Sequence, residues 1–230
     1  MRDLHEDLLE RWSQEQHHQG QCFIKDGIID VDRWQSADPK VLFLLKEARH
    51  CGKGTWDLRK YLREKAPSEA TWRNAAYWCY AIHHIRSGKL PGRPFLPDRK
   101  VEYDKAVEAL RSSAVVNIKK SKGKTTSALE DIERYARRDK PSIQQQIELI
   151  KPDVVICGNT WQFVENWWPD KKSIYDGTWK VRQVVFIDFW HPSYRVSGDL
   201  KYYALAAMLH FSNALAKYAW KRQPKCGLDD

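Results

Sequence analysis

Four short apolar runs constrain the fold of this chain more than any other feature of its sequence. They lie at 41–45, 114–118, 154–157 and 184–189, and polar stretches of helical pattern separate them. Short runs that are apolar on both faces are typical of parallel strands buried between two layers of helices. We therefore expect an α/β protein: a single-domain, three-layer α/β/α sandwich around a central, mainly parallel four-stranded sheet.

The whole chain, residues 1–230, is predicted to form one domain, because its length suits a single core and no repeat or interdomain linker interrupts it. Two additions to that domain are expected: a helical N-terminal extension at 1–38 and a tryptophan-rich helical insertion at 56–97. The apolar periodicity and the breaker residues predict helices at 3–19, 56–86, 98–111, 126–138, 142–150, 160–168 and 200–221.

The composition points to a polyanionic partner. Lys and Arg number 39 against 30 Asp and Glu, which gives a net charge of +9, and the chain contains 11 Trp. Basic side chains pair with phosphates and aromatic rings stack on bases, so the combination favours nucleic acid. No apolar run approaches the ~18 residues of a membrane span. The five cysteines lack C-x-x-C spacing and His83-His84 lacks a partner at metal-ligand spacing, so we expect no disulfide framework, metal site or cofactor. A monomer in the bacterial cytoplasm, or associated with the nucleoid, fits these features.

The polar residues that follow the predicted strands form the candidate site. Glu47, Asn117, the pair Gly158-Asn159 and His191 come at or just after the strand ends. Because the carboxyl ends of parallel strands meet at one edge of a sheet, where α/β proteins bind ligands, we expect these residues to lie together. His191 opens a His-Pro-Ser loop that leads into a helix. The loop brings an imidazole and a helix N-terminus to one point, which suits the stabilisation of a developing anion.

Each of these residues has a functional and a structural interpretation. His191 either donates a hydrogen bond to an oxygen that gains charge or caps a strand end. Asn117 offers a donor and an acceptor that match the edge of a base, or it forms a turn. Glu47 orients a water molecule or stabilises a cationic sugar, or it forms an ion pair with Lys46 or Arg49.

Two further features are predicted to contact nucleic acid. The loop after the second strand is rich in lysine, and Lys119, Lys122 and Lys124 are expected to bind phosphates; a solvated run of charges is the alternative. Trp56 follows the first strand closely enough to stack on an extruded base, with core packing as the alternative.

Four segments, in this order, resemble motifs of the uracil-DNA glycosylase superfamily, over about residues 40 to 210. The run VLFLLKEA at 41–48 resembles the family's first motif, a strand that ends in Gly-Glu-Ala-Pro-Gly or a variant. VVNIKK at 115–120 looks like the strand whose Asn reads the base. QQQIELIKPDVVICG at 144–158 is similar to the helix and strand that precede a Leu-Gly or similar turn. HPSYR at 191–195 resembles the second catalytic motif.

The resemblance implies a role for each matching residue. Glu47 matches the carboxylate of the first motif, Asn117 matches the base-reading Asn, and His191 matches the residue that stabilises the leaving base anion. Trp56 lies near the aromatic residue that stacks under the base. Arg195 falls where the family places the wedge that enters the DNA helix as the nucleotide leaves.

Departures from the motifs indicate a substrate other than plain uracil. Lys46 replaces the usual Gly, and His50, a predicted base-binding residue, stands where the uracil-strict branch places a Tyr that excludes 5-substituted pyrimidines. Ser193 and Tyr194 are expected to contact DNA beside Arg195. A hypermodified phage cytosine is one such substrate, and antiphage defence is then the biological setting.

The sequence thus predicts a monofunctional DNA glycosylase. It would hydrolyse the N-glycosidic bond of a flipped-out uracil-like or modified pyrimidine and leave an abasic site. A non-catalytic nucleic-acid-binding module on the same fold is the alternative, because the first motif is degenerate. A nucleotide or sugar-phosphate enzyme is disfavoured, because the first strand lacks a glycine-rich turn for a phosphate.

Overall fold

The computed structural model describes residues 4–49, 54–65, 67–85, 99–124 and 126–212. Its helices are α1 (Leu4–Ser13), η1 (Gln16–His18), α2 (Val31–Ser36), α3 (Leu58–Glu64), α4 (Ala70–His84), α5 (Arg99–Arg111), α6 (Leu129–Arg138), α7 (Lys140–Ile150), α8 (Trp161–Val164), η3 (Glu165–Trp167) and α9 (Gly198–Phe211). Its strands are β1 (Phe23–Lys25), β2 (Gly27–Ile28), β3 (Val41–Glu47), β4 (Thr55–Asp57), β5 (Ala114–Lys119), β6 (Val154–Gly158), β7 (Lys172–Tyr175), β8 (Thr178–Val181) and β9 (Val184–Phe189).

The central sheet has seven strands in the order β2-β5-β3-β6-β9-β8-β7, and β1 pairs with β4 in a separate two-stranded sheet. The four predicted strands are β3, β5, β6 and β9, and they run parallel to one another. The prediction of a mainly parallel α/β sheet is confirmed, but the prediction of four strands is wrong. The additional strands in the central sheet are antiparallel to their neighbours. The sequence did not predict β2 or β7, because β2 has only two residues and all four side chains of β7 are exposed, so neither produces an apolar run.

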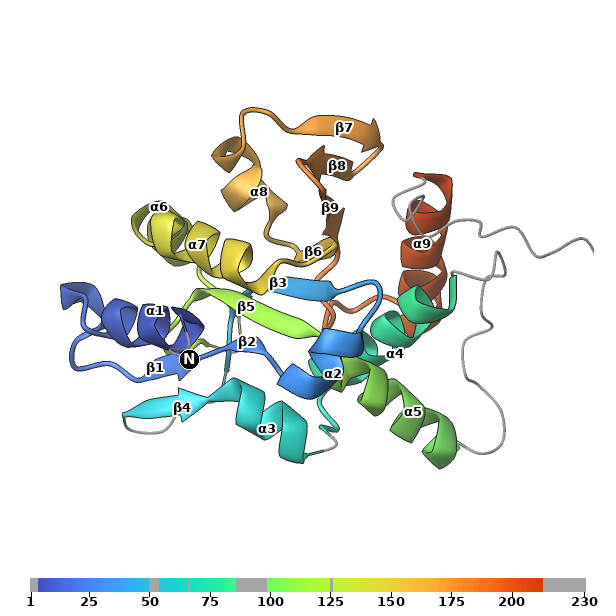
Figure 1. The fold of residues 1–230 in the computed structure, drawn as a ribbon, viewed down its shortest axis with the longest axis horizontal. Helices are drawn as coiled ribbons and strands as arrows, with labels where there is room; N and C mark the ends of the chain where they lie inside the picture. The colour runs from blue at the N-terminus through green and yellow to red at the C-terminus, as the bar shows by residue number, and fades with distance from the viewer. Residues whose placement is uncertain (1–3, 50–53, 66, 86–98, 125, 213–230) are drawn as a thin grey trace, which may run out of the picture.

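Helices cover both faces of the sheet (Figure 1). Alternate residues of the parallel strands contribute to two separate cores, one on each face. Along β3, Val41, Phe43 and Leu45 point to the first core, which α3, α4, α5 and α9 cover. Leu42 and Leu44 point to the second core, beneath α1, α2, α6, α7 and α8. Buried on both faces, these strands require the near-continuous apolar runs that the sequence shows.

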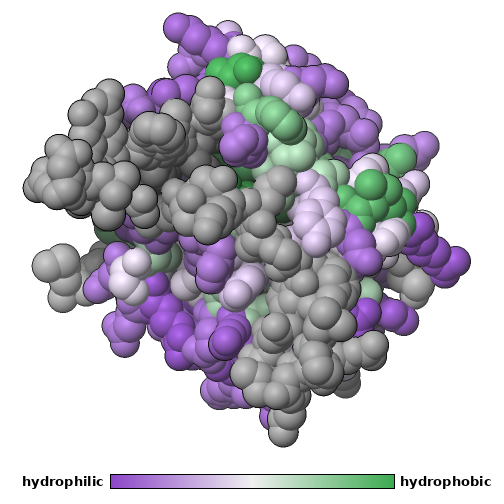
Figure 2. All heavy atoms as spheres, turned by 90° about the vertical axis from the view of Figure 1, so that its right-hand side faces the viewer, coloured by the Kyte–Doolittle hydropathy of each residue, from purple (hydrophilic) through white to green (hydrophobic). Residues whose placement is uncertain are grey.

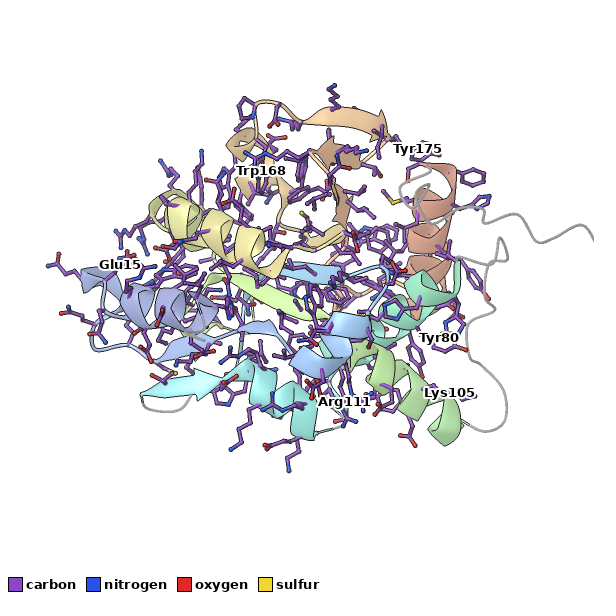
Figure 3. All side chains as sticks on the ribbon, in the orientation of Figure 1. Glu15, Tyr80, Lys105, Arg111, Trp168 and Tyr175 are labelled. Atoms are coloured by element: carbon purple, nitrogen blue, oxygen red, sulfur yellow. The ribbon has the colours of Figure 1, made fainter. Side chains whose placement is uncertain are left out.

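Side chains fill the space between the sheet and both helical layers (Figure 3). Trp168, labelled there, packs at a tilt with its ring centroid 4.5 Å from that of Phe186 on β9, and Trp161 stacks on Trp179 at 4.2 Å. Much of the tryptophan content is therefore core packing. Among the described residues visible on the side of α4, α5 and α9, most are hydrophilic, with separate hydrophobic patches between them (Figure 2).

Capping residues explain several helix boundaries. The carboxylate of Asp57 accepts hydrogen bonds from the backbone N–H groups of Arg59 and Lys60, which starts α3. Pro141 stands in the first turn of α7, and Lys151 ends that helix with a left-handed φ of 54°. These local signals are why the predicted helix at 142–150 nearly matches the observed one.

The two predicted additions differ from expectation. The segment 1–38 is not purely helical, because it includes β1 and β2, and β2 joins the central sheet by pairing with β5. Trp12 of α1 is buried in the second core, so this segment is part of the domain's structure. The tryptophan-rich segment starts with a strand, β4, and contributes Trp72 and Trp78 to the first core; its residues 86–97 lie outside the described part of the chain.

Two further expectations concern cysteines and membranes. Cys79 and Cys157 are buried free thiols, whereas Cys22 is disulfide-bonded, which the cysteine spacing did not predict. Among the described helices, none is both long and apolar enough to cross a bilayer.

Candidate functional site

The carboxyl ends of β3 and β6 form the topological switch point of the sheet. From β3 the chain crosses to β5 on one side and then returns past β3 to β6 on the other. The two connections leave the sheet in opposite directions, and ligands of open α/β sheets bind in the crevice outside the strand ends at such a point. Here β3 ends at Glu47 and β6 ends at Gly158, followed by Asn159.

The His-Pro-Ser loop lies directly against Gly158 at the end of β6. A Cβ atom at this position would lie 2.6 Å from Leu45 Cδ2, 3.4 Å from Pro192 Cδ and 3.6 Å from His191 Cα. It would therefore clash with the Leu45 side chain and come into van der Waals contact with the loop. The backbone N–H of Asn159 also donates to the carbonyl of Phe189, at 2.7 Å, just before the loop begins. The sequence prediction that His191 and the end of β6 lie together is confirmed.

The same loop is fixed from the helical side by two residues that sequence reasoning missed. Asn74 Nδ2 of α4 donates to the carbonyl of Pro192 at 2.7 Å. Lys201 Nζ of α9 donates to the carbonyls of Pro192 and Tyr194, both at 2.9 Å. Lys201 is buried. The sequence offers one signal for its role, which is that a lysine stands in a largely apolar helix whose other buried residues pack on the core.

The imidazole of His191 is held neutral. The backbone N–H of Ser193 donates to His191 Nδ1 at 3.2 Å, and Ser193 Oγ lies 2.8 Å from the same nitrogen. A backbone N–H can only donate, so Nδ1 is the acceptor and the neutral ring carries its proton on Nε2. Burial, together with the positive charges of Lys46 and Lys201, lowers the pKa of His191 to about 4. At neutral pH the ring is therefore an uncharged hydrogen-bond donor, the state suited to an oxygen that gains negative charge.

Lys46 completes the positive surroundings of this histidine. It stands near the end of β3, where burial lowers the pKa of its ammonium group and Glu47 partly opposes that shift. The positive charges of Lys46 and Lys201 act on His191, so they favour negative charge on a ligand that contacts it.

Glu47 forms an ion pair, but with a partner other than the two expected. Its Oε2 lies 3.1 Å from Lys119 Nζ on the neighbouring strand β5, and Lys119 Nζ also donates to Asp131 of α6 at 2.7 Å. Burial lowers the pKa of Lys119, but its hydrogen bonds to Asp131 and Glu47 outweigh that effect and raise it. Lys119 is buried between two carboxylates, so the geometry does not support the prediction that it binds a DNA phosphate.

The lysine-rich loop is clamped onto the end of β3. The backbone N–H of Gly123 donates to the carbonyl of Ala48 at 2.8 Å, and that of Lys124 donates to Glu47 Oε1 at 3.3 Å. A Cβ at position 123 would lie 2.5 Å from Glu47 Cγ, so the close approach requires glycine. Lys122 and Lys124 are exposed on this fixed loop. Glu47 thus anchors the loop, and its predicted role in activating water stays a prediction.

Asn117 does not face the switch point. Its side chain is buried, and both its backbone N–H and its Nδ2 donate to Asp26 Oδ2, at 2.8 and 3.1 Å. Lys120 Nζ donates to the other oxygen of Asp26 and to Gln146 Oε1, at 2.5 and 2.9 Å. The geometry contradicts the prediction that Asn117 offers its amide to a base, because a buried internal network already engages that amide.

The other predicted contact residues divide into two groups. Ser193, Tyr194 and Arg195 are exposed on the loop that carries His191, as expected. Trp56 belongs to the separate β1–β4 sheet and packs with its ring 5.8 Å from that of Tyr61, so the structure favours core packing over base stacking. His50 lies outside the described residues.

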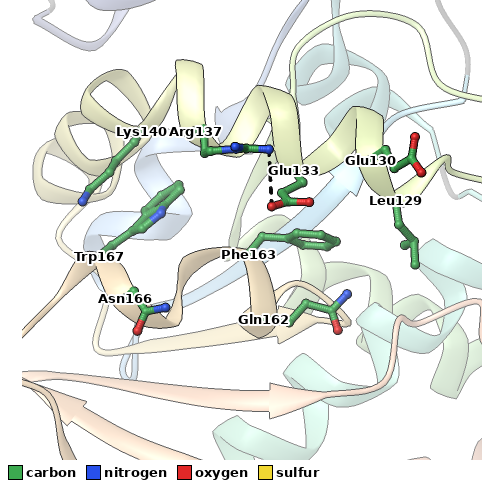
Figure 4. Close-up of a pocket in the computed structure, with 9 residues that line it drawn as sticks. All are labelled: Leu129, Glu130, Glu133, Arg137, Lys140, Gln162, Phe163, Asn166 and Trp167. Atoms are coloured by element: carbon green, nitrogen blue, oxygen red, sulfur yellow. Dashed lines mark ion pairs between the residues drawn. The ribbon is translucent and has the colours of Figure 1, made fainter.

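An open groove of about 610 Å³ lies on another part of the surface, between α6 and the segment α8–η3 (Figure 4). Its walls combine the aromatic rings of Phe163 and Trp167 with charged residues of α6, where Arg137 pairs with Glu133 at 3.4 Å. None of the predicted site residues lines it.

In comparisons with known proteins, no family model, no curated protein and no solved structure matches the chain. The arrangement at the switch point therefore carries the functional argument.

Proposed function

We propose that the protein is a monofunctional DNA glycosylase that hydrolyses the N-glycosidic bond of a flipped-out uracil-like or modified pyrimidine, and that it acts as a cytoplasmic monomer. One observation carries the proposal. His191 is neutral, the backbone of Ser193 engages its Nδ1 beside the switch point, and the positive charges of Lys46 and Lys201 act on the ring. That is an electrostatic arrangement for stabilising a leaving anion.

The reaction follows from the charge distribution. As the bond between C1′ and the base nitrogen breaks, its electron pair moves onto the base and collects on the carbonyl oxygen beside that nitrogen. Nε2–H of His191 donates a hydrogen bond to this oxygen, and Lys46 and Lys201 favour its negative charge. Water then adds to C1′ and loses a proton to solvent, and the base anion takes up a proton from solvent, which leaves an abasic site and the free base.

DNA binding is assigned to the exposed basic residues beside the switch point. Lys122 and Lys124 stand on the clamped loop at the end of β3, and Arg195 stands on the loop of His191. Together they supply phosphate contacts on both sides of the crevice. Flipping a nucleotide costs a few kcal/mol, which such contacts and base stacking offset.

Asn159 replaces Asn117 as the proposed base-reading residue. It is exposed immediately after β6, at the switch point, and its φ of 60° places it in the left-handed region. Asn tolerates this backbone conformation better than most side chains. Its amide offers the donor and acceptor pair that a pyrimidine edge requires.

A glycosylase assay tests the proposal. Labelled oligonucleotides, each with one uracil, hypoxanthine, hydroxymethylcytosine or glucosylated hydroxymethylcytosine, and modified phage DNA are incubated with protein and then treated with alkali. We expect strand breaks at one of these bases with wild type, no breaks with His191→Ala, and wild-type breaks with the control His84→Ala, whose histidine is exposed on α4. Equal cleavage by wild type and His191→Ala would refute the mechanism.

One feature favours the binding-module alternative. Glu47 and Asn117, to which the resemblance assigns functions, contact Lys119 and Asp26 within the protein instead. Tight DNA binding without alkali-labile sites on any substrate in the panel would support that alternative over the glycosylase.

A further inference from the structure

Two adjacent histidines of η1 face a carboxylate at the junction of α6 and α7. His17 Nε2 lies 2.6 Å from Asp139 Oδ1, and His18 Nε2 lies 3.3 Å from Asp139 Oδ2. One nitrogen or oxygen atom from each residue lies within 4.8 Å of the other two. The side chains of His18 and Asp139 are fully buried, and that of His17 is 15% exposed.

Three buried atoms of this cluster lack hydrogen-bond partners, although His17 Nε2 and Asp139 Oδ1 are hydrogen-bonded to each other. Both ring nitrogens of His18 and the Oδ2 atom of Asp139 make no hydrogen bond in the described part of the chain. An unpaired buried polar atom destabilises the folded protein, so several such atoms side by side call for a ligand. A single cation between His18 Nε2 and Asp139 Oδ2 would satisfy both atoms.

The Asp139 side chain faces the histidines and does not cap the helix that it precedes. It is the N-cap residue of α7, where an Asp side chain usually accepts a hydrogen bond from the first turn, yet it makes no such bond. The carboxylate is turned toward the imidazoles instead, which indicates that its contact with them, or with an ion that they bind, stabilises the fold more than the cap bond would.

The surroundings of the cluster are mainly aromatic around its inner histidine, and a carboxylate lies near its outer one. Three aromatic rings enclose His18, with centroids 5.1 Å away for Phe23, 5.8 Å for Tyr135 and 6.3 Å for Trp12. His17 Nδ1 lies 3.8 Å from a carboxylate oxygen of Glu15, a residue at the outer edge of the molecule (Figure 3). Metal-bound histidines commonly direct their second nitrogen at such a carboxylate.

We propose that His17, His18 and Asp139 bind a divalent transition-metal ion of the zinc type, through Nε2 of each histidine and one oxygen of Asp139. Two imidazoles and a carboxylate suit Zn²⁺, whose bonds of about 2.0–2.2 Å place tetrahedral ligands roughly 3.3 Å apart. His18 and Asp139 already have that separation. His17 must draw back by less than an ångström, and its partial exposure leaves room for that movement and for a water as fourth ligand.

The ion would have a structural role. It would join η1, near the N-terminus, to the α6–α7 junction more than a hundred residues later, and so hold the first segment of the chain against the second core. This role is independent of the proposed glycosylase reaction, which uses no metal.

Cobalt binding to the full chain tests the site. Protein freed of metal with a chelator is titrated with Co²⁺ and then with Zn²⁺ in competition. Co²⁺ in a tetrahedral site shows strong visible d–d absorption. We expect one equivalent of Co²⁺, displaced by Zn²⁺, and two paramagnetically shifted, exchangeable proton signals from the Nδ1–H groups of His17 and His18. These signals identify the ligands without any substitution.

Matched variants complete the test. Asp139→Asn preserves side-chain volume and His18→Gln removes one ligand; each is expected to weaken Co²⁺ binding by at least about 100-fold. His84→Gln, in the chain's other adjacent histidine pair, is expected to bind like wild type. Wild-type protein without d–d absorption or shifted imidazole protons would overturn the proposal, as would undiminished binding in a folded Asp139→Asn. If both variants fail to fold, the wild-type signals alone decide.

Discussion

Histidines occupy two contrasting regions of this molecule. At the switch point, the charges of Lys46 and Lys201 act on His191, and a backbone N–H occupies its Nδ1. At the α6–α7 junction, His17 and His18 face the buried carboxylate of Asp139. Burial and, after it, the two nearby cations keep the first imidazole neutral and suited to an anion, whereas a carboxylate makes the second pair suitable for a cation.

The contrast shows that the charge and hydrogen-bond partners of an imidazole, more than its burial, determine what it can bind. It also separates the two regions experimentally, because each should respond to a different ligand. The predictions below test that separation, beginning with the largest expected effect.

The largest effect is expected on the chemical step. His191→Ala should lower the single-turnover rate of base excision by about 10²–10³-fold, the usual cost of removing one donor to a developing anion. DNA affinity should stay near that of wild type, since phosphate contacts remain. His18→Gln should leave the rate of the folded protein near the wild-type value. Comparable losses in both variants would show that the two regions are not separate.

A smaller effect is expected from the amide at the switch point. Asn159→Gly keeps the left-handed φ at no steric cost and removes only the side chain. Loss of one base-edge contact of about 1–3 kcal/mol should lower kcat/KM by about 10-fold, without a change in the free energy of unfolding. Asn159→Asp is the control that retains shape and should discriminate differently among pyrimidines. A wild-type kcat/KM in Asn159→Gly would remove this residue from the site.

The lysines of the basic loop should show effects of only a few fold. Lys122→Gln and Lys124→Gln should each weaken DNA binding and reduce the slope of log K against log salt by about 1. Lys119→Gln should leave that slope unchanged and lower the free energy of unfolding instead, because it strips Glu47 and Asp131 of their shared partner. Filter binding at several salt concentrations and urea denaturation measure both quantities. An equal change in slope for Lys119 and Lys122 would contradict the assignment.

The sequence predicted the parts of the fold that depend on local pattern. Strands β3, β5, β6 and β9 appeared as apolar runs because both their faces are buried, and the same runs placed the switch point. Short or exposed strands such as β2 and β7 have no such pattern and were missed.

The site was predictable only in part, because side-chain partners are non-local. His191 and the exposed loop residues could be located from their position after β9. The buried partner of Asn117 is Asp26, 91 residues earlier, and that of His18 is Asp139, so neither pairing has a signature in the sequence. A strand-end Asn looks the same whether it faces a ligand or an internal carboxylate.

The smallest expected effect concerns the pKa of His191. Burial is the largest cause of its low pKa and Lys46 comes next, so Lys46→Met should raise the pKa above about 4 while leaving it below 6.5. In wild type, the unfolded chain binds a proton at His191 near pH 6.5 and the folded protein only near pH 4, so acidification across this range favours unfolding. Excision should likewise fall as the pH drops through about 4, when the ring becomes charged and Nδ1 must give up the N–H of Ser193.

In Lys46→Met the acid limb of the rate profile and the titration of the His191 ring, followed by NMR, should move upward together. Lys46→Arg keeps the charge and should titrate like wild type. A ring pKa that stays near 4 in Lys46→Met would show that Lys46 does not contribute to the cationic environment. A pKa at or above 6.5 would show that cations, and not burial, were the main cause. Either result would change the account of the switch point, because the neutral state of His191 would then depend on a different part of its surroundings.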